Sequence, residues 1–214
     1  MLVETVTVAD AVANELRRRL LAGEYASGQE LRDTDLTAEF GAARPTIRAA
    51  VQTLVADGLL ERGRGRSARV PSFTAADAVD LYRLRRPIEL AAVRLIIETA
   101  PPLDGVQTAL RAFTSLPDEV SWDKVADADI EFHRAVLTAA GSSRLLRTFN
   151  EAGAELRLLI AQQRPAYRGA RQIAAEHAVL LSALRAGGKR AAVDAWKEHL
   201  DSAERFFLDL IAPT

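Results

Sequence analysis

The stretch LTAEFGAARPTIRAAV, residues 36–51, decides how the N-terminal part of the chain folds. Gly41 separates two short segments, 33–40 and 44–57, whose apolar residues recur at helical spacing. The inward face of the second segment is marked at positions i, i+3, i+4 and i+7 by Ile47, Ala50, Val51 and Leu54. Two short helices joined by a tight glycine turn are typical of a helix-turn-helix.

The sequence on either side of this pair completes a small domain. Residues 7–22 have the apolar spacing of a further helix, closed by Gly23. Residues 59–70, LLERGRGRSARV, contain two short extended pieces around a Gly-Arg-Gly turn, which predicts a β-hairpin. Only residues 58–70 have a convincing strand pattern, and a hairpin that directly follows a helix-turn-helix forms a wing.

The rest of the chain has a purely helical pattern. We expect about six helices, separated by proline and glycine breaks, at 74–99, 103–115, 121–139, 142–164, 169–186 and 189–211. The sequence therefore predicts a mainly α protein. A winged helix-turn-helix domain occupies residues 1–71, and an all-α domain of about six helices occupies residues 72–214.

Charge is distributed unevenly along the chain. The net charge of the 214 residues is −1, but residues 44–69 contain six arginines against Asp57 and Glu61, a local balance of +4. A basic patch on a near-neutral chain is typical of a modular DNA-binding protein. The absence of cysteine excludes disulfides, and no apolar run is long enough to span a bilayer, so we expect a cytoplasmic protein without a membrane partner.

The first turn of the second helix carries the side chains that DNA recognition needs. Residues from this turn meet base edges in the major groove, and here it offers Arg44, Thr46 and Arg48. Arginine opposes the helix dipole at this end, but it bridges O6 and N7 of guanine. The alternative is that both arginines are merely solvated, and the adjoining hairpin favours the DNA-binding interpretation.

This part of the sequence resembles the GntR superfamily of bacterial transcription regulators. The resemblance rests on GQEL, residues 28–31, and on DLTAEFGAARPTIRAAVQTLVADGLLERGRGRSARV, residues 35–70. It implies double-stranded operator DNA as a partner, contacted by Arg44, Thr46, Arg48, Arg64 and Gly65. Two positions depart from the family pattern: Ala43 replaces a hydroxyl residue, and Thr34 replaces an arginine that commonly contacts DNA.

The chain has three histidines, and all of them lie on apolar helix faces of the C-terminal domain. In DIEFHRAV, residues 129–136, Asp129 and His133 are four residues apart and point the same way; the other two are His177 and His199. Such a set suits a divalent metal, zinc above all, with nickel or manganese as further candidates. The alternative is a hydrogen-bonded polar network in the core.

DIEFHRAV, EHAVLLSAL and AWKEHL resemble motifs of the FCD group, named after the FadR C-terminal domain. The length and the six helices fit its shorter, VanR-like branch. The resemblance implies that Asp129, His133, His177 and His199 bind metal, and that a small carboxylate effector completes the coordination shell.

Two further residues are candidates for effector binding. Arg85 lies on the apolar stripe of its helix with Glu89 four residues later, so it either forms a buried ion pair or offers a bidentate fork to an effector carboxylate. We expect Asn150 to point either into the cavity that would hold the effector or to solvent.

These observations predict a ligand-responsive transcription regulator that binds a palindromic operator as a homodimer. We expect a repressor, and an activator is the alternative that the sequence leaves open. Two alternative functions remain. A metal-dependent hydrolase-like enzyme is disfavoured, because Glu131 and Glu176 are expected on neighbouring helix faces, leaving no general base beside the site. The other alternative is a regulator for which the metal itself is the signal.

Overall fold

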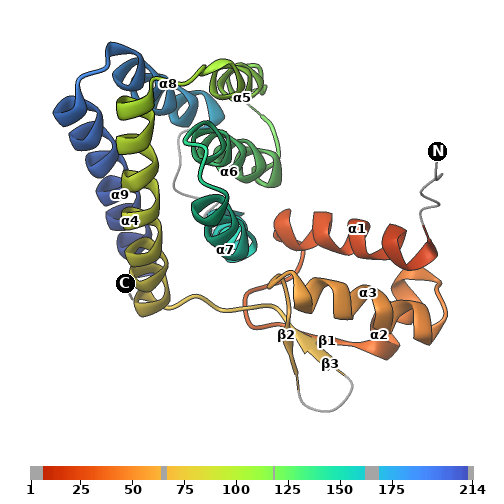
Figure 1. Ribbon diagram of the computed structural model, residues 1–214. Coiled ribbons are helices and arrows are strands. Elements are labelled where there is room, and N and C mark those ends of the chain that lie inside the picture. Colours follow the sequence, from red (N-terminus) through yellow and green to blue (C-terminus); the bar gives the residue numbers. More distant parts are fainter. Residues whose placement is uncertain (1–6, 64–66, 118, 162–168, 212–214) are drawn as a thin grey trace, which may run out of the picture. The chain divides into compact units, whose positions relative to one another are not determined.

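The computed structural model describes residues 7–63, 67–117, 119–161 and 169–211 (Figure 1). The chain forms two compact units, Met1–Ser72 and Phe73–Thr214, and each is described by itself. Most described residues are helical, and the strands are confined to one small sheet in the first unit. The predicted fold class, mainly α with a winged helix-turn-helix followed by an all-α domain, is confirmed.

The first unit combines three helices with a three-stranded antiparallel sheet. Its elements are α1 (Val8–Leu21), β1 (Glu30–Arg32), α2 (Asp33–Phe40), α3 (Arg44–Ala56), β2 (Glu61–Arg62) and β3 (Ser67–Arg69). Thr7 and Asp10 cap the start of α1 reciprocally, since each side chain binds the backbone N–H of the other residue. The helices pack over a core that contains Leu16, Ile47 and Leu54.

The sheet corrects the expectation that residues 58–70 form the only strands of this unit. β1 pairs with β3, giving the order β1-β3-β2. Leu31 lies opposite Ala68 in the register, and both are buried. A strand of three residues is too short to show alternation in the sequence, and β1 exists because β3 supplies its hydrogen-bond partners.

Gly41 closes the turn between α2 and α3. Its φ is +61°, in the left-handed region that non-glycine residues rarely adopt. A Cβ at this position would meet no atom within 4 Å, so the requirement for glycine comes from the backbone conformation alone. The turn sets how the recognition helix α3 leaves α2.

The second unit contains the six helices that the sequence predicts. They are α4 (Ala75–Thr99), α5 (Asp104–Thr114), α6 (Trp122–Ala139), α7 (Ser143–Ala161), α8 (Ala170–Ala186) and α9 (Lys189–Ile211). α4 begins with a capping box in which Thr74 and Asp77 bind each other's backbone N–H. α4 and α9 run side by side, and α6 packs against α5 and α7 (Figure 1).

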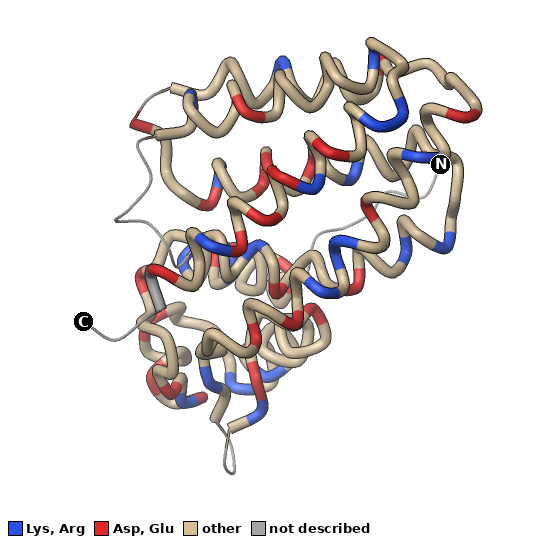
Figure 2. The backbone as a smooth tube through the Cα atoms, turned by 90° about the vertical axis from the view of Figure 1, so that its left-hand side faces the viewer, with Lys and Arg blue, Asp and Glu red and all other residues tan. Residues whose placement is uncertain are grey.

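The core of this unit is apolar except at its centre. Trp196, Phe132 and Leu200 are fully buried among the helices. Among the described residues of this unit, Arg85, Glu89, Asp123, Asp129, His133 and His177 are the buried polar or charged side chains. Elsewhere, Lys and Arg are interspersed with Asp and Glu along the helices (Figure 2).

We expect Gly41→Ala to lower the free energy of unfolding of the first unit by about 1 kcal/mol, because alanine is strained at positive φ. Gly41→Asn should cost less, since asparagine tolerates this conformation. Urea unfolding followed by circular dichroism measures both changes. Equal destabilisation by the two substitutions would contradict the conformational explanation.

Candidate metal centre and DNA-binding face

Three helices bring the three histidines together in the centre of the second unit. His133 lies on α6, His177 on α8 and His199 on α9. The Nε2 atom of His133 is 3.2 Å from Nε2 of His177 and 3.4 Å from Nε2 of His199. One nitrogen from each ring lies within 4.8 Å of the other two, so the three imidazoles can donate to a common metal ion.

Hydrogen bonds on the far side of two rings determine which nitrogen carries the proton. Nδ1 of His133 is 2.7 Å from Oε2 of Glu89, and Nδ1 of His177 is 2.7 Å from the carbonyl oxygen of Ile173. Both oxygens only accept, so each Nδ1 donates a proton. In the neutral rings the two facing Nε2 atoms therefore carry lone pairs, which cannot bond each other.

Asp129 adds a further acceptor to this cluster. Its Oδ1 lies 3.1 Å from Nε2 of His177, so the carboxylate and the imidazole lone pairs converge on one region. Burial raises the pKa of Asp129, but the contact with His177 and the nearby positive charges outweigh it and hold that pKa well below its ordinary value. Asp129 is therefore an anion at neutral pH.

Protonation of His133 and His199 is opposed by their surroundings, which lower the pKa of both rings. Burial lowers the pKa of His133, and the Glu89 carboxylate offsets this only in part. Burial and the two neighbouring histidines lower the pKa of His199 well below its ordinary value. The surroundings thus disfavour protons on two of the three rings of the cluster.

Glu89 holds the centre together, a role the sequence indicated only as a possible pair with Arg85. Its carboxylate accepts hydrogen bonds from Nε of Arg85 at 2.7 Å, from Nδ1 of His133, and from Nε1 of Trp196 at 2.9 Å. Burial raises the pKa of Glu89, but the Arg85 charge and the His133 contact outweigh it and keep the group ionised. The i, i+4 spacing of Arg85 and Glu89 is the only feature of the sequence that indicated a partner for Glu89. Nothing in the sequence indicated its contacts with His133 on α6 and Trp196 on α9.

Arg85 forms the buried ion pair that the sequence allowed, and it retains one unused donor. Nη1 lies 3.3 Å from the hydroxyl of Tyr82, whereas the buried Nη2 has no hydrogen-bond partner. Arg85 also lines a cavity of about 30 Å³. The lining comprises Tyr82, Arg85, Trp122, Val125, Asp129, Ile160, Ile173, Glu176, His199, Ala203 and Phe207.

Glu176 and Asn150 lie differently with respect to this cavity. Glu176 was expected on a neighbouring helix face, but it lines the cavity with Oε2 at 4.0 Å from Nδ1 of His199, so that expectation is wrong. Burial raises the pKa of Glu176. Asn150 is exposed on α7 and is not among the described residues that line the cavity, in line with the solvent-facing alternative.

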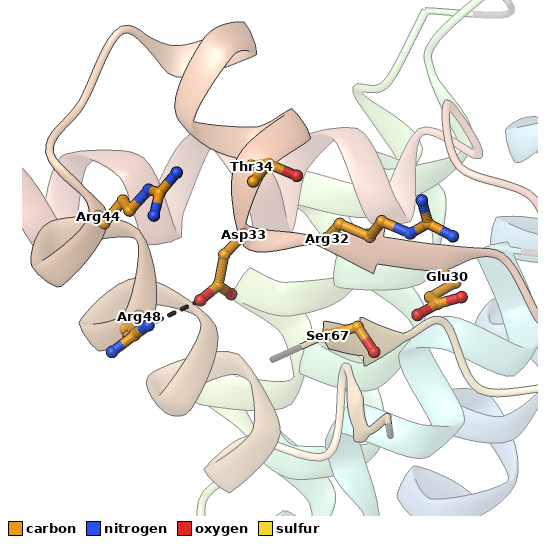
Figure 3. A pocket seen from close by; sticks show the side chains of 7 residues that line it. All are labelled: Glu30, Arg32, Asp33, Thr34, Arg44, Arg48 and Ser67. Atoms are coloured by element: carbon orange, nitrogen blue, oxygen red, sulfur yellow. Dashed lines mark hydrogen bonds and ion pairs between the residues drawn. The ribbon is translucent and has the colours of Figure 1, made fainter. Parts of the chain in front are cut away.

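The candidate DNA-binding residues lie at the start of α3. Arg44 and Arg48 are exposed, and Thr46 is half-buried. Arg48 is not simply solvated, because its Nε donates to Oδ2 of Asp33 at 2.9 Å (Figure 3). The Asp33 side chain is 12% exposed and that of Arg48 46%, so a nearly buried carboxylate anchors a half-exposed guanidinium.

A hollow of about 280 Å³ lies in front of this helix start, between α2, α3 and the sheet (Figure 3). Its lining combines both arginines of α3 with Glu30, Arg32, Asp33, Thr34 and Ser67. Ala43 is the N-cap residue of α3, and its side chain has no hydrogen-bond acceptor. The first backbone N–H groups of α3 are therefore not capped by a side chain. The wing-tip residues Arg64 and Gly65 lie outside the described residues.

Both units match known protein families. Residues 8–70 match the bacterial regulatory proteins of the gntR family, and residues 80–202 match the FCD domain. The chain is 34% identical to the HTH-type transcriptional regulator YdhC of Bacillus subtilis over 41% of its length, a match that spans 39% of YdhC. It is 27% identical to a probable D-xylose utilization operon transcriptional repressor of Paenarthrobacter nicotinovorans over 91% of this chain and 86% of that protein.

A solved structure shares the whole architecture. The crystal structure of a putative transcriptional regulator GntR from Rhodococcus sp. RHA1 superposes with a TM-score of 0.79 at 29% identity, covering 94% of this chain and 97% of that one. E. coli McbR/YncC has the same fold, with a TM-score of 0.73 at 20% identity.

A winged helix-turn-helix followed by an all-helical unit with a buried histidine cluster defines the class of two-domain transcription regulators. The chain belongs to the GntR family of bacterial regulatory proteins and carries an FCD domain. These families and relatives are transcriptional regulators rather than enzymes, which removes the hydrolase alternative. Within the described part of the chain, no helix combines the length and hydropathy needed to cross a bilayer.

The depressed pKa values predict how acid affects the metal-free protein. His133 and His199 are held neutral when folded but take up protons when unfolded below about pH 6.5, so stability falls as pH decreases through that value. Each contributes a slope of up to about 1.4 kcal/mol per pH unit. Glu89 and Asp129 have lowered pKa values too, and their contribution is lost below about pH 4.5.

Urea unfolding of chelator-treated protein between pH 7.5 and 5 measures this slope. Both tryptophans, Trp122 and Trp196, lie in the helical unit, so their fluorescence reports on that unit. His199→Asn should make the slope shallower. A free energy of unfolding that stays constant or rises on acidification would contradict the assignment of neutral rings.

Proposed function

We propose that this chain is a repressor whose helical unit binds a divalent metal through Asp129, His133, His177 and His199, and responds to a small carboxylate effector at that metal. It binds a palindromic operator as a homodimer. The observation that carries the metal assignment is the convergence of three imidazole nitrogens and a carboxylate oxygen on one region.

The spacing of the ring nitrogens supports a metal of tetrahedral or similar coordination. Two ligands that each lie 2.0–2.1 Å from zinc at a tetrahedral angle are about 3.4 Å apart. The Nε2 separations of 3.2 and 3.4 Å are close to that value. Metal-bound histidines usually donate the other N–H to a carboxylate or a carbonyl, as His133 does to Glu89 and His177 to Ile173. Zinc fits this donor set best, and nickel or manganese would use the same ligands with open positions.

Arg85 supports an anionic effector. Its unpartnered Nη2 lies in a site where a buried donor costs about 1–3 kcal/mol, and a carboxylate oxygen at the cavity would satisfy it. The effector carboxylate would then lie between this guanidinium and the metal. The other effector candidate, Asn150, lacks this support because it is exposed.

The size of the cavity favours a second candidate, in which the metal alone is the signal. A volume of about 30 Å³ accommodates a water molecule or two but not an organic acid unless the helices move. In the effector case, binding favours an arrangement with a larger cavity, and operator DNA favours another; the coupling is reciprocal. Measuring operator affinity against metal concentration, with and without candidate carboxylates, separates the two cases.

The DNA interface is assigned to Arg44, Thr46 and Arg48, with Arg64 and Gly65 at the wing tip. Asp33 binds Nε of Arg48, which leaves both terminal amino groups of the guanidinium for the bidentate contact with guanine. Asp33 therefore positions Arg48 and restricts the bases it can accept. Arg44 and Thr46 lie in the same first turn and complete the contact surface.

Elemental analysis of the purified protein after refilling with zinc, nickel or manganese tests the metal site. We expect about one ion per chain in the parent and none in His133→Ala or His177→Ala, because each removes a ligand. Circular dichroism checks that the variants remain folded. Metal retained in both variants, or absent from the parent, would mean that Asp129 and the histidines form a hydrogen-bonded core network instead.

The role of Asp33 is tested by operator binding in gel-shift titrations. Arg48→Ala should cost about 1–3 kcal/mol in operator affinity. Asp33→Asn should reduce the ratio of operator to random-DNA affinity about tenfold, while binding to random DNA stays constant or tightens as a negative charge is lost. The double variant should match Arg48→Ala, because Asp33 acts through that arginine.

Asp35→Asn is the matched control, since Asp35 is an exposed acid on the same helix turn whose carboxylate accepts a hydrogen bond from the hydroxyl of Thr34. Additive losses in the double variant, or an equal loss in the control, would exclude a positioning role for Asp33.

A further inference from the structure

One face of α7 carries four charged side chains that form no ion pair with another residue described by the structure. Arg144, Arg147, Glu151 and Glu155 are all exposed, and none forms an ion pair with another described residue. Some other exposed charges of this unit are paired, among them Arg134 with Glu131 and Lys189 with Glu98.

The spacing of the four residues places them on a single stripe. Steps of three, four and four residues repeat at the helical period, so all four side chains lie on the same side of α7. The two arginines come first and the two glutamates follow. The stripe is positive over its first half and negative over its second.

Such a stripe is complementary to itself when two copies run antiparallel. With a two-fold axis near residue 149, Arg147 and Glu151 lie roughly 3 Å on either side of it along the helix, and Arg144 and Glu155 roughly 8 Å. Each arginine then faces a glutamate of the second copy. An isologous contact repeats every pair, which gives four interchain ion pairs.

The groove beside the stripe supports the same partner. α4 and α7 border a hollow of about 460 Å³, lined by Asp77, Asp80, Leu81, Leu84, Thr148, Glu151, Ala152 and Glu155. Its four carboxylates suit the arginines at the start of a second α7. Leu84, whose exposed fraction of 38% is high for a large apolar residue, would be covered by the same contact.

We propose that α7 forms the homodimer interface by packing antiparallel against α7 of a second copy, with Arg147 facing Glu151 and Arg144 facing Glu155 across the axis. This inference rests on the proposed function, which requires a homodimer, and it assigns the surface that forms it. The ionic pairs are partly exposed, so they supply the orientation and the register more than the affinity, and the dimer weakens as salt rises.

Charge reversal tests the interface, because a two-fold contact makes the rescue predictable. Arg147→Glu and Glu151→Arg each place like charges across the axis, and each should raise the dimer dissociation constant at least about tenfold in sedimentation equilibrium. An equimolar mixture of the two variants restores opposite charges in the heterodimer, so it should return to within about threefold of the parent. The double variant R147E/E151R should do the same.

Lys197→Glu on α9 makes the same charge change elsewhere on this unit and should leave the dissociation constant unchanged. A parent protein that dimerises while Arg147→Glu dimerises equally well would overturn this interface and leave the proposed function intact. A parent that is monomeric with and without operator DNA would overturn the proposed homodimer itself. Rescue in the double variant but not in the mixture would show that the charges act within one helix, which also overturns the interface.

Discussion

A carboxylate buried without a partner is among the most costly groups in a protein core, and Glu89 is fully buried in the helical unit. Its two oxygens accept bonds from three elements: Arg85 on its own helix, His133 on α6 and Trp196 on α9. Removing any of these donors would leave charge unsatisfied. This requirement fixes how α4, α6 and α9 meet, and it determines which nitrogen of His133 faces the other two rings. The orientation of His133 on which the proposed metal site depends is thus a consequence of how one anion is satisfied.

The same arrangement, an acid that orients a functional side chain, occurs in the DNA-binding unit. Asp33 holds Arg48 as Glu89 holds His133. Asp33 is more buried than the arginine it holds, whereas Glu89 and His133 are both fully buried. The acid removes rotational freedom before the ligand arrives, which lowers the entropy that binding must overcome. The terminal amino groups of the arginine of α3 are then left for the proposed DNA contact, and Nε2 of the histidine of α6 for the proposed metal.

The residues that could be predicted from the sequence are those with a local pattern. Helical periodicity and glycine or proline breaks placed all six helices of the second unit within a few residues, and the spacing of Asp129 and His133 indicated a common face. β1 was missed because three residues show no alternation and depend on β3 for their hydrogen bonds. Glu176 was misplaced because a helical wheel shows which face a residue occupies, but not which neighbouring helix turns that face towards a cavity.

The sequence by itself determined the two-part architecture, the family and the apolar helix faces that carry Asp129 and the three histidines, since each of these follows from local spacing and residue type. Only the tertiary structure decided that the histidines of three helices share one centre. It also decided that Glu89, rather than solvent, accepts the proton on Nδ1 of His133, and that Asp33 anchors Arg48. These contacts join residues between 15 and 66 positions apart. No periodicity within one helix encodes such distances, because they are set by how the side chains of different helices pack.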